Sequence, residues 1–261
     1  MISEINSANN PKVKHIIKLA SSSSYRKENR EFFLEGLRLC FDAAKSKMKI
    51  SAVYFTKKAF EKNSENINEL VFVSEAAYLI SDGVCEKISE TKNSQGVFCV
   101  CKMLCEKDEN DIDSKFKYVA LDNVQNPDNL GAISRTAEAL GINGLIISGG
   151  CDIYNPKAQR ASMGSLFRLP VIKTEKLPSL LMSLGSRGMK IYSTTPDSNS
   201  KSVVEADFSG GVVAVIGNEA NGVSEEVFAV CQKITIPMEG RAESLNAAMA
   251  AAITMWEMMR K

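Results

Sequence analysis

The stretch "YVALDNVQNPDNLGAISRTAEALGINGLIISGG", Tyr118 to Gly150, has the pattern of two strands joined by a helix. "YVALD" and "GLIIS" are short apolar runs, and the segment between them carries apolar residues at helical spacing. Strands that are apolar throughout and separated by helices are typical of a parallel sheet covered on both faces. This stretch therefore predicts an α/β fold for the second half of the chain.

The same alternation continues to the C-terminus. Further strands are predicted in 169–174, 189–195, 212–217 and 233–238, and further helices in 155–167, 177–188, 224–231 and at the end of the chain. Ligands of parallel sheets bind beyond the carboxyl ends of the strands. Polar clusters follow four of the predicted strands, so we expect them to meet on one rim: 122–131, 193–198, 217–222 and 237–246.

The first part of the chain reads as a smaller α/β unit. Helices are predicted in 10–20 and 37–46, and strands in 31–36, 50–56 and 96–102. Residues 106–115 are polar and mostly acidic, which suits an exposed linker. The predicted domains are therefore 1–105 and 116–261, joined by 106–115.

The first sixty residues are basic, with twelve Lys and Arg against five acids, although the net charge of the 261-residue chain is only +1. Such a patch is either a solvated helical face or a docking surface for phosphates. The residues predicted to contact RNA are Lys12, Lys14, Arg26, Lys27 and Arg30.

Composition indicates a cytoplasmic protein. No apolar run approaches the roughly 20 residues of a membrane span, and no leader pattern opens the chain. Seven scattered cysteines fit a reducing compartment better than a disulfide framework. Cys99, Cys101 and Cys105 lie close together, but a structural zinc site needs four ligands, so no metal is expected.

Several reaction classes lose support from what the sequence lacks. The single histidine, His15, lies in the basic half, and neither a dinucleotide fingerprint nor a P-loop is present. The remaining Asn, Arg, Glu, Ser and Gly clusters suit a site in which a bound reagent carries the reactive group. Methyl transfer from a sulfonium fits this description, because it needs mainly positioning and a dry pocket.

Local patterns assign a first set of roles. Asp128 or Asn129 is expected to cap a helix whose apolar stripe faces away from Arg135. Arg135 is then either a surface side chain or a guanidinium that grips an RNA phosphate. Gly217 ends a buried strand, where a missing side chain lets a ligand approach the backbone, with Glu219 and Asn221 lining the turn.

The final helix carries apolar residues at helical spacing. Ser244 is expected to cap it, and its buried stripe is predicted to contain Leu245, Met249, Ala252, Ile253 and Trp256. This stripe indicates packing, within the chain or between subunits.

Three motifs in this order and spacing, "NPDNLGAISRTAEALG", "IGNEANGVS" and "IPMEGRAESLNAAMAAAI", resemble the SpoU (TrmH) family of S-adenosylmethionine-dependent RNA ribose 2′-O-methyltransferases, a branch of the SPOUT class. "RASMGSLFRLP" resembles a further family element. "FLEGLRLCFDA" and "SETKNSQGVFCV" are similar to a small ribosomal-protein-like α/β RNA-binding domain that often precedes the catalytic domain. The resemblance implies a parallel sheet with a trefoil knot, and a homodimer packed through the knot region.

The resemblance also implies the site residues. The residues implied to bind the methyl donor are Gly217, Ile236, Leu245, Thr194, Thr195 and Met238. Those implied around the reacting ribose are Arg135, Asn129, Glu219, Ser244 and Asn246. Since the pKa of arginine is above ~12, Arg135 is expected to bond the 2′-oxygen and a phosphate rather than act as a free base.

Other functions remain open from the sequence. A non-catalytic RNA-binding protein on the same fold would have kept the donor pocket without transferring a methyl group. A nucleotide-dependent α/β enzyme would bind NAD or ATP. Among RNA substrates, the two-domain layout favours ribosomal RNA over transfer RNA.

Overall fold

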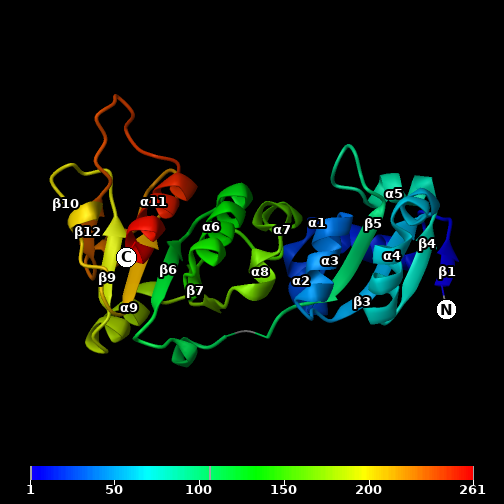
Figure 1. Ribbon diagram of the computed structural model, residues 1–261, viewed down its shortest axis with the longest axis horizontal. Helices are drawn as coiled ribbons and strands as arrows, with labels where there is room; N and C mark the ends of the chain where they lie inside the picture. Colours follow the sequence, from blue (N-terminus) through cyan, green and yellow to red (C-terminus); the bar gives the residue numbers. More distant parts are fainter. Residues whose placement is uncertain (1, 106, 261) are drawn as a thin grey trace. The chain divides into compact units, whose positions relative to one another are not determined.

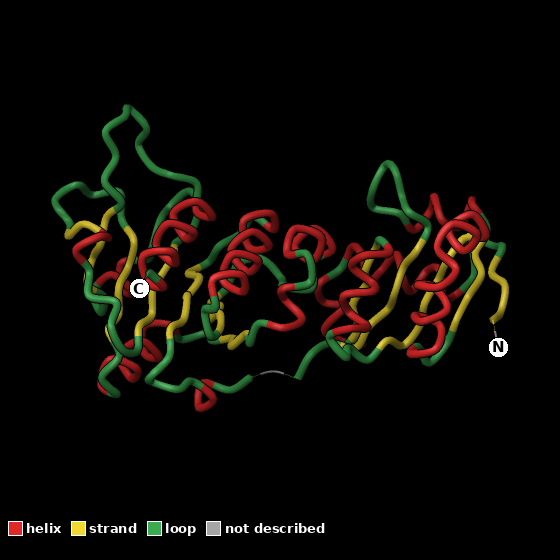
Figure 2. Tube along the Cα trace, viewed as in Figure 1, coloured by secondary structure: helices red, strands yellow, loops and turns green. Residues whose placement is uncertain are grey.

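The computed structural model describes residues 2–105 and 107–260, and the chain divides into two compact units. The first unit takes in the chain up to Cys105 and the segment Asp152–Phe167, and the second takes in the remainder. Each unit contains a sheet with helices packed against it (Figures 1 and 2).

The first unit is built on a mixed five-stranded sheet of order β1-β4-β3-β5-β2. β1, β4 and β3 run parallel, and β5 is antiparallel to both β3 and β2. The strands are β1 (Ile2–Ile5), β2 (Glu31–Glu35), β3 (Ile50–Thr56), β4 (Ala77–Ile80) and β5 (Val97–Lys102); the helices are α1 (Pro11–Ser21), α2 (Ser23–Asn29), α3 (Leu37–Lys45), α4 (Lys57–Val73) and α5 (Asp82–Ile88).

All five elements predicted for this unit are confirmed, while β1, β4, α2, α4 and α5 were not predicted. β1 is an edge strand with three of its four residues exposed, so it lacks the apolar pattern that reveals a buried strand. Cys99 and Cys101 on β5 are fully buried, which fits their interpretation as small core residues.

The segment Asp152–Phe167 packs with the first unit although the sequence places it in the second half. It contains α7 (Pro156–Ser162) and runs into α8 (Ser165–Arg168). The Tyr154 ring lies 4.8 Å from the ring of Phe32, and the Tyr154 hydroxyl accepts a 3.0 Å hydrogen bond from the Leu104 amide. Apolar burial thus holds this segment to β2. The domain boundaries drawn from the sequence stay a prediction.

The second unit is a seven-stranded sheet of order β10-β12-β9-β11-β6-β7-β8 in which every pair is parallel, as predicted. Its strands are β6 (Lys117–Asp122), β7 (Gly144–Ser148), β8 (Val171–Lys173), β9 (Lys190–Thr194), β10 (Lys201–Ser202), β11 (Val212–Ile216) and β12 (Gln232–Thr235). Its helices are α6 (Pro127–Leu140), α9 (Leu177–Ser186), α10 (Glu225–Phe228) and α11 (Ala247–Met259), with 3₁₀ turns η1 (Glu109–Asp111) and η2 (Val203–Glu205).

The strand order places a switch point between β6 and β11. From β6 the chain continues to β7 on one side, and from β11 it continues to β12 on the other. Parallel sheets often bind ligands at such a switch point, but here Asn218 and Glu219, after β11, bond to the loop that follows β6. The trefoil knot implied by the resemblance concerns chain threading, which strand order does not establish, and it stays a prediction.

Two further features bear on the sequence expectations. The linker was predicted over 106–115; residue 106 lies outside the described residues, and 107–115 are mostly exposed, but Ile112 is buried in the core of the second unit. Within residues 2–105 and 107–260, every helix is too short or too polar to cross a membrane.

Candidate functional site

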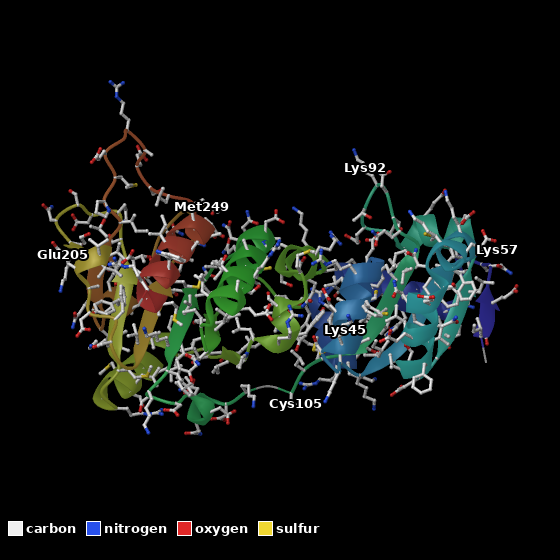
Figure 3. All side chains as sticks on the ribbon, viewed as in Figure 1. Lys45, Lys57, Lys92, Cys105, Glu205 and Met249 are labelled. Carbon is white, nitrogen blue, oxygen red and sulfur yellow. The ribbon has the colours of Figure 1, made fainter. Side chains whose placement is uncertain are left out.

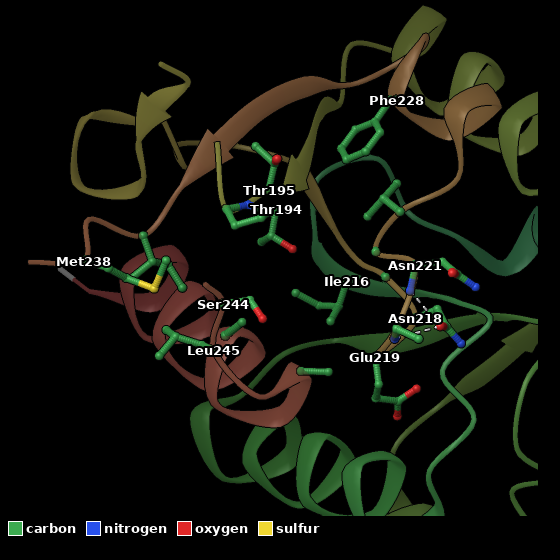
Figure 4. A pocket seen from close by; sticks show the side chains of 18 residues that line it. Thr194, Thr195, Ile216, Asn218, Glu219, Asn221, Phe228, Met238, Ser244 and Leu245 are labelled. Atoms are coloured by element: carbon green, nitrogen blue, oxygen red, sulfur yellow. Dashed lines mark hydrogen bonds between the residues drawn. The ribbon is translucent and has the colours of Figure 1, made fainter. Parts of the chain in front are cut away.

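Loops that follow β9, β11 and β12 line one cavity of about 300 Å³ in the second unit (Figure 4). Three of the four polar clusters predicted to meet on one rim therefore do so, and the fourth, 122–131, does not line the cavity. The cavity is lined by Thr194, Thr195, Pro196, Ile216, Gly217, Asn218, Glu219, Ala220, Asn221, Gly222, Val223, Phe228, Ile236, Met238, Ser244, Leu245, Ala247 and Ala250. This set contains all six residues implied to bind the methyl donor, and that binding role stays a prediction.

Gly217 ends β11 at a point where its loop folds back on itself. A Cβ atom at Gly217 would lie 2.2 Å from the carbonyl carbon of Gly222 and 2.2 Å from the nitrogen of Val223. On the side of the missing Cβ, the backbone that approaches Gly217 is the chain's own; Gly217 also lines the cavity, and its contact with a ligand stays a prediction. Closure of this loop is by itself enough to require a glycine at position 217.

Asn218 organises this loop, and the sequence analysis did not single it out. Its backbone exchanges two 2.9 Å hydrogen bonds with Gly222, and its Oδ1 accepts from the amides of Ala220 (2.9 Å) and Asn221 (3.1 Å). Its Nδ2 donates to the carbonyl of Asn123, 2.9 Å away, in the loop after β6. An Asn at the start of a glycine-closed turn is the signal that predicts such an arrangement.

The loop presents Glu219 to the N-terminal end of α6. Glu219 Oε1 accepts from the Asn126 amide (3.0 Å) and from Asn129 Nδ2 (2.8 Å), and Oε2 accepts from the Gln125 amide (3.1 Å). Burial raises the pKa of Glu219, but these hydrogen bonds outweigh burial, so its pKa is lowered and the carboxylate stays ionised at neutral pH. The cluster after β6 thus reaches the cavity wall through Glu219.

Asn129 continues the network to the third motif. It is 6% exposed, and its Oδ1 accepts a 3.0 Å hydrogen bond from Asn246 Nδ2. Asn246 Oδ1 in turn accepts from the backbone amides of Ala248 (2.9 Å) and Met249 (3.3 Å). The structure therefore brings Asn129, Glu219 and Asn246 together in one hydrogen-bonded chain.

Both predicted helix caps in this region are wrong by a few residues. Asn126, not Asp128 or Asn129, caps α6, and its side chain accepts from the Asp128 amide at 2.8 Å. Asn246, not Ser244, caps α11. Each cap precedes or follows another residue with a suitable side-chain oxygen, and only the backbone path decides which one turns towards the free amides.

Arg135 is exposed on α6, facing away from the buried stripe formed by Leu130, Ile133 and Ala137, as predicted. It is not among the residues that line the cavity. Six residues separate it from Asn129, which is about 9 Å along a helix axis. Ser244, by contrast, is part of the cavity wall (Figure 4).

α11 buries a different face from the predicted one. Leu245, Met249, Ile253 and Trp256 are exposed, with Trp256 58% exposed. The buried residues are Ala248, Ala251, Thr254, Met255 and Met258. The small residues of this face allow α11 to pack closely on α6 beside the buried Met255 and Met258, while Met249, labelled in Figure 3, lies on the exposed side.

The basic residues of the first unit divide into two groups. Lys12, Lys14, Lys27 and Arg30 are exposed, as a phosphate contact requires. Arg26 is 3% exposed, because its guanidinium binds Asp152 at 2.8 Å and the carbonyl of Leu19 at 2.7 Å. The RNA contact predicted for Arg26 is therefore corrected to a buried ion pair within the unit.

Metal ligands do not gather in the described part of the chain. No three His, Cys, Asp or Glu side chains of residues 2–105 and 107–260 are close enough together to hold an ion.

Comparison with known proteins gives matches along the whole chain. Residues 117–256 match the SpoU rRNA methylase family, and residues 10–99 match the MRM3-like substrate binding domain. The chain is 32% identical to the 23S rRNA (guanosine(2553)-2′-O)-methyltransferase RlmP of Bacillus subtilis over 257 residues, 98% of each protein.

Solved structures of similar proteins agree with these matches. The AdoMet-bound rRNA methyltransferase from Sinorhizobium meliloti has a TM-score of 0.86 and 30% identity, covering 99% of this chain and 98% of that one. The SpoU methyltransferase AviRb from Streptomyces viridochromogenes in complex with AdoMet has a TM-score of 0.85 and 26% identity, covering 97% and 98%.

Proposed function

Because the chain belongs to the SpoU rRNA methylase family, we propose that it transfers the methyl group of S-adenosylmethionine to a ribose 2′-hydroxyl of ribosomal RNA. The observation that carries this proposal is the cavity in the second unit, which gathers all six residues implied to bind the donor. The AdoMet-bound Sinorhizobium meliloti relative supports the choice of donor.

The residues present fit this donor. Ile216, Ile236, Met238 and Leu245 supply apolar surface to the cavity. Glu219, whose lowered pKa keeps it charged, adds a carboxylate to the same wall, and this charge complements a sulfonium. When bound, S-adenosylmethionine supplies a methyl group on a good leaving group. The protein therefore has to bind and orient the two substrates and to exclude water.

All five residues implied around the reacting ribose stay proposed there: Arg135, Asn129, Glu219, Ser244 and Asn246. Arg135 is exposed on α6, and its planar guanidinium suits contact with an RNA phosphate. It bonds the 2′-oxygen and a neighbouring phosphate, and the phosphate or a water molecule takes the proton. Turnover of Arg135→Lys and Arg135→Ala tests this role, and near-normal turnover of Arg135→Ala would contradict it.

The RNA substrate is proposed from the first unit and from the relatives. One relative is a 23S rRNA methyltransferase, and residues 10–99 match the MRM3-like substrate binding domain. Contact with RNA phosphates is supported by the exposure of four cationic residues, Lys12, Lys14, Lys27 and Arg30. A tritium-transfer assay on rRNA and tRNA, together with a ribose methylation map of a deletion strain, identifies the substrate. Donor binding without transfer to either RNA would instead indicate a non-catalytic RNA-binding protein.

A homodimer through the region of α11 is proposed from its exposed apolar face. Leu245, Met249, Ile253 and Trp256 expose large apolar side chains in or next to one helix, which is unusual for a surface without a partner. Sedimentation of the wild type and of Trp256→Lys tests the dimer. We expect Trp256→Lys to shift the protein towards monomer, and a wild type that sediments as a monomer at micromolar concentration would refute the proposal.

A further inference from the structure

Asn129 does not line the donor cavity, yet its side chain bonds to both walls of that cavity. We propose that Asn129 is a positioning residue, which ties the loop carrying Glu219 and the start of α11 to helix α6. The identity of the ligand in the cavity rests on the function proposed above; the tie itself rests on the contacts described here.

One wall is the loop Asn218–Gly222. It contributes Glu219 to the cavity lining, and the carboxylate of Glu219 receives the Nδ2 hydrogen bond of Asn129 at 2.8 Å. A hydrogen bond to a charged acceptor is roughly twice as strong as a neutral one. Asn129 therefore holds this wall through its strongest contact.

The other wall is the first turn of α11 and the residues before it. Ser244, Leu245, Ala247 and Ala250 line the cavity, and Asn246 lies among them as the helix cap. Asn246 Nδ2 donates to Asn129 Oδ1 at 3.0 Å. The same amide thus both caps α11 and connects it to α6.

The direction of every hydrogen bond in this chain is determined. The backbone amides of Ala248 and Met249 are donors, so they orient the oxygen of Asn246 towards α11 and its nitrogen towards Asn129. Asn129 then turns its oxygen to Asn246 and its nitrogen to the carboxylate of Glu219. Reversing either amide would place two oxygens against each other, so the network is cooperative.

The consequence concerns α6, which also carries Arg135. Since Asn129 joins both cavity walls to this helix, a displacement of either wall shifts or loosens the helix that presents the guanidinium. Loss of the tie is expected to weaken donor binding and to lower turnover.

The substitution Asn246→Asp should break the hydrogen bond to Asn129 and keep the cap of α11. Aspartate caps a helix as well as asparagine does, so the cap of α11 should be kept. The new carboxylate oxygen faces Asn129, however, and no orientation of the Asn129 amide can donate to both residue 246 and Glu219. We expect the dissociation constant for S-adenosylmethionine, measured by calorimetry, to rise about tenfold, or about 1.4 kcal/mol. In an Asn129→Ala background the same substitution should add little.

Ser134→Ala is the matched control, because Ser134 is a buried polar residue on the same helix whose hydroxyl donates to Gly131 within it. It should leave the donor affinity unchanged. Equal donor affinities for Asn246→Asp and the wild type, or additive effects in the double variant, would overturn the proposal.

Amide hydrogen exchange tests the tie without any ligand. Asn129→Ala should speed exchange at Gln125 and Asn126 on one side and at Ala248 on the other, whereas Ser134→Ala should not. Unchanged exchange at all three amides would refute the tie. A wild type that binds no S-adenosylmethionine would refute the proposed function instead, and the exchange result would still decide the positioning role.

Discussion

Replacing Gly217 by alanine should open the loop that forms one wall of the donor cavity. The new Cβ would lie 2.2 Å from two backbone atoms of Gly222 and Val223, whereas carbon atoms in contact prefer about 3.5–4.0 Å. These neighbours belong to the backbone, so no side-chain rotation relieves the overlap. The loop must separate by about 1 Å, which breaks the two 2.9 Å hydrogen bonds between Asn218 and Gly222.

The expected loss of stability follows from these contacts. Two hydrogen bonds contribute about 1 kcal/mol each, and overpacking adds about 1–3 kcal/mol where the loop cannot fully relax. We therefore expect Gly217→Ala to lower the free energy of unfolding by about 2–4 kcal/mol and to weaken donor binding, because Glu219 lies in the displaced loop.

Urea unfolding followed by the fluorescence of Trp256 measures this change, because Trp256 is the single tryptophan and lies on α11 of the second unit. Gly240→Ala is the control, since a Cβ at Gly240 would meet no heavy atom within 4 Å. If Gly217→Ala unfolds within about 0.5 kcal/mol of the wild type, which is the usual range of surface substitutions, and binds the donor normally, the steric argument is wrong.

Three further predictions concern stability. Asn126→Ala removes the α6 cap and should cost about 1 kcal/mol in thermal unfolding, whereas Asn126→Asp should not. Arg26→Met removes the buried guanidinium's ion pair with Asp152 and its hydrogen bond to the Leu19 carbonyl, and should cost about 3–5 kcal/mol; a circular dichroism melt equal to that of the wild type would contradict this. Burial raises the pKa of Glu31, but its hydrogen bonds, above all the one with Lys102, lower the pKa by a larger amount. The pKa of Glu31 in the folded protein is therefore lowered. Glu31 therefore stabilises the fold above its unfolded pKa of 4.5, and this contribution is lost as the pH falls through the lower folded value. Glu31→Gln should make the free energy of unfolding depend less on pH in the acidic range.

Local patterns were sufficient to predict much of the architecture. The alternation of apolar strands with helices after Phe116 predicted an all-parallel sheet, and the polar clusters at strand ends predicted where its site would lie. Both signals are local in sequence, because a run of about five to fifteen residues is enough to show a buried strand and the helix that follows it.

The sequence was less able to predict which individual side chains are buried. Arg26 has the same charge as Lys27, and only the approach of Asp152, 126 residues away, buries one and leaves the other exposed. α11 is apolar on almost every side, so its sequence does not show which face is buried. Its packing on α6 decided that Ala248 and Ala251 face inward and Trp256 outward.

The sequence by itself determined the fold class, the family motifs and the identities of the residues that meet at the cavity. Only the tertiary structure decided what they do to one another. Asn129 lies 90 residues from Glu219 and 117 from Asn246, and which atom of its amide faces which partner depends on the direction of the hydrogen bonds at the end of α11. A motif records which side chains are present, but hydrogen-bond direction is a property of atoms brought together from distant parts of the chain.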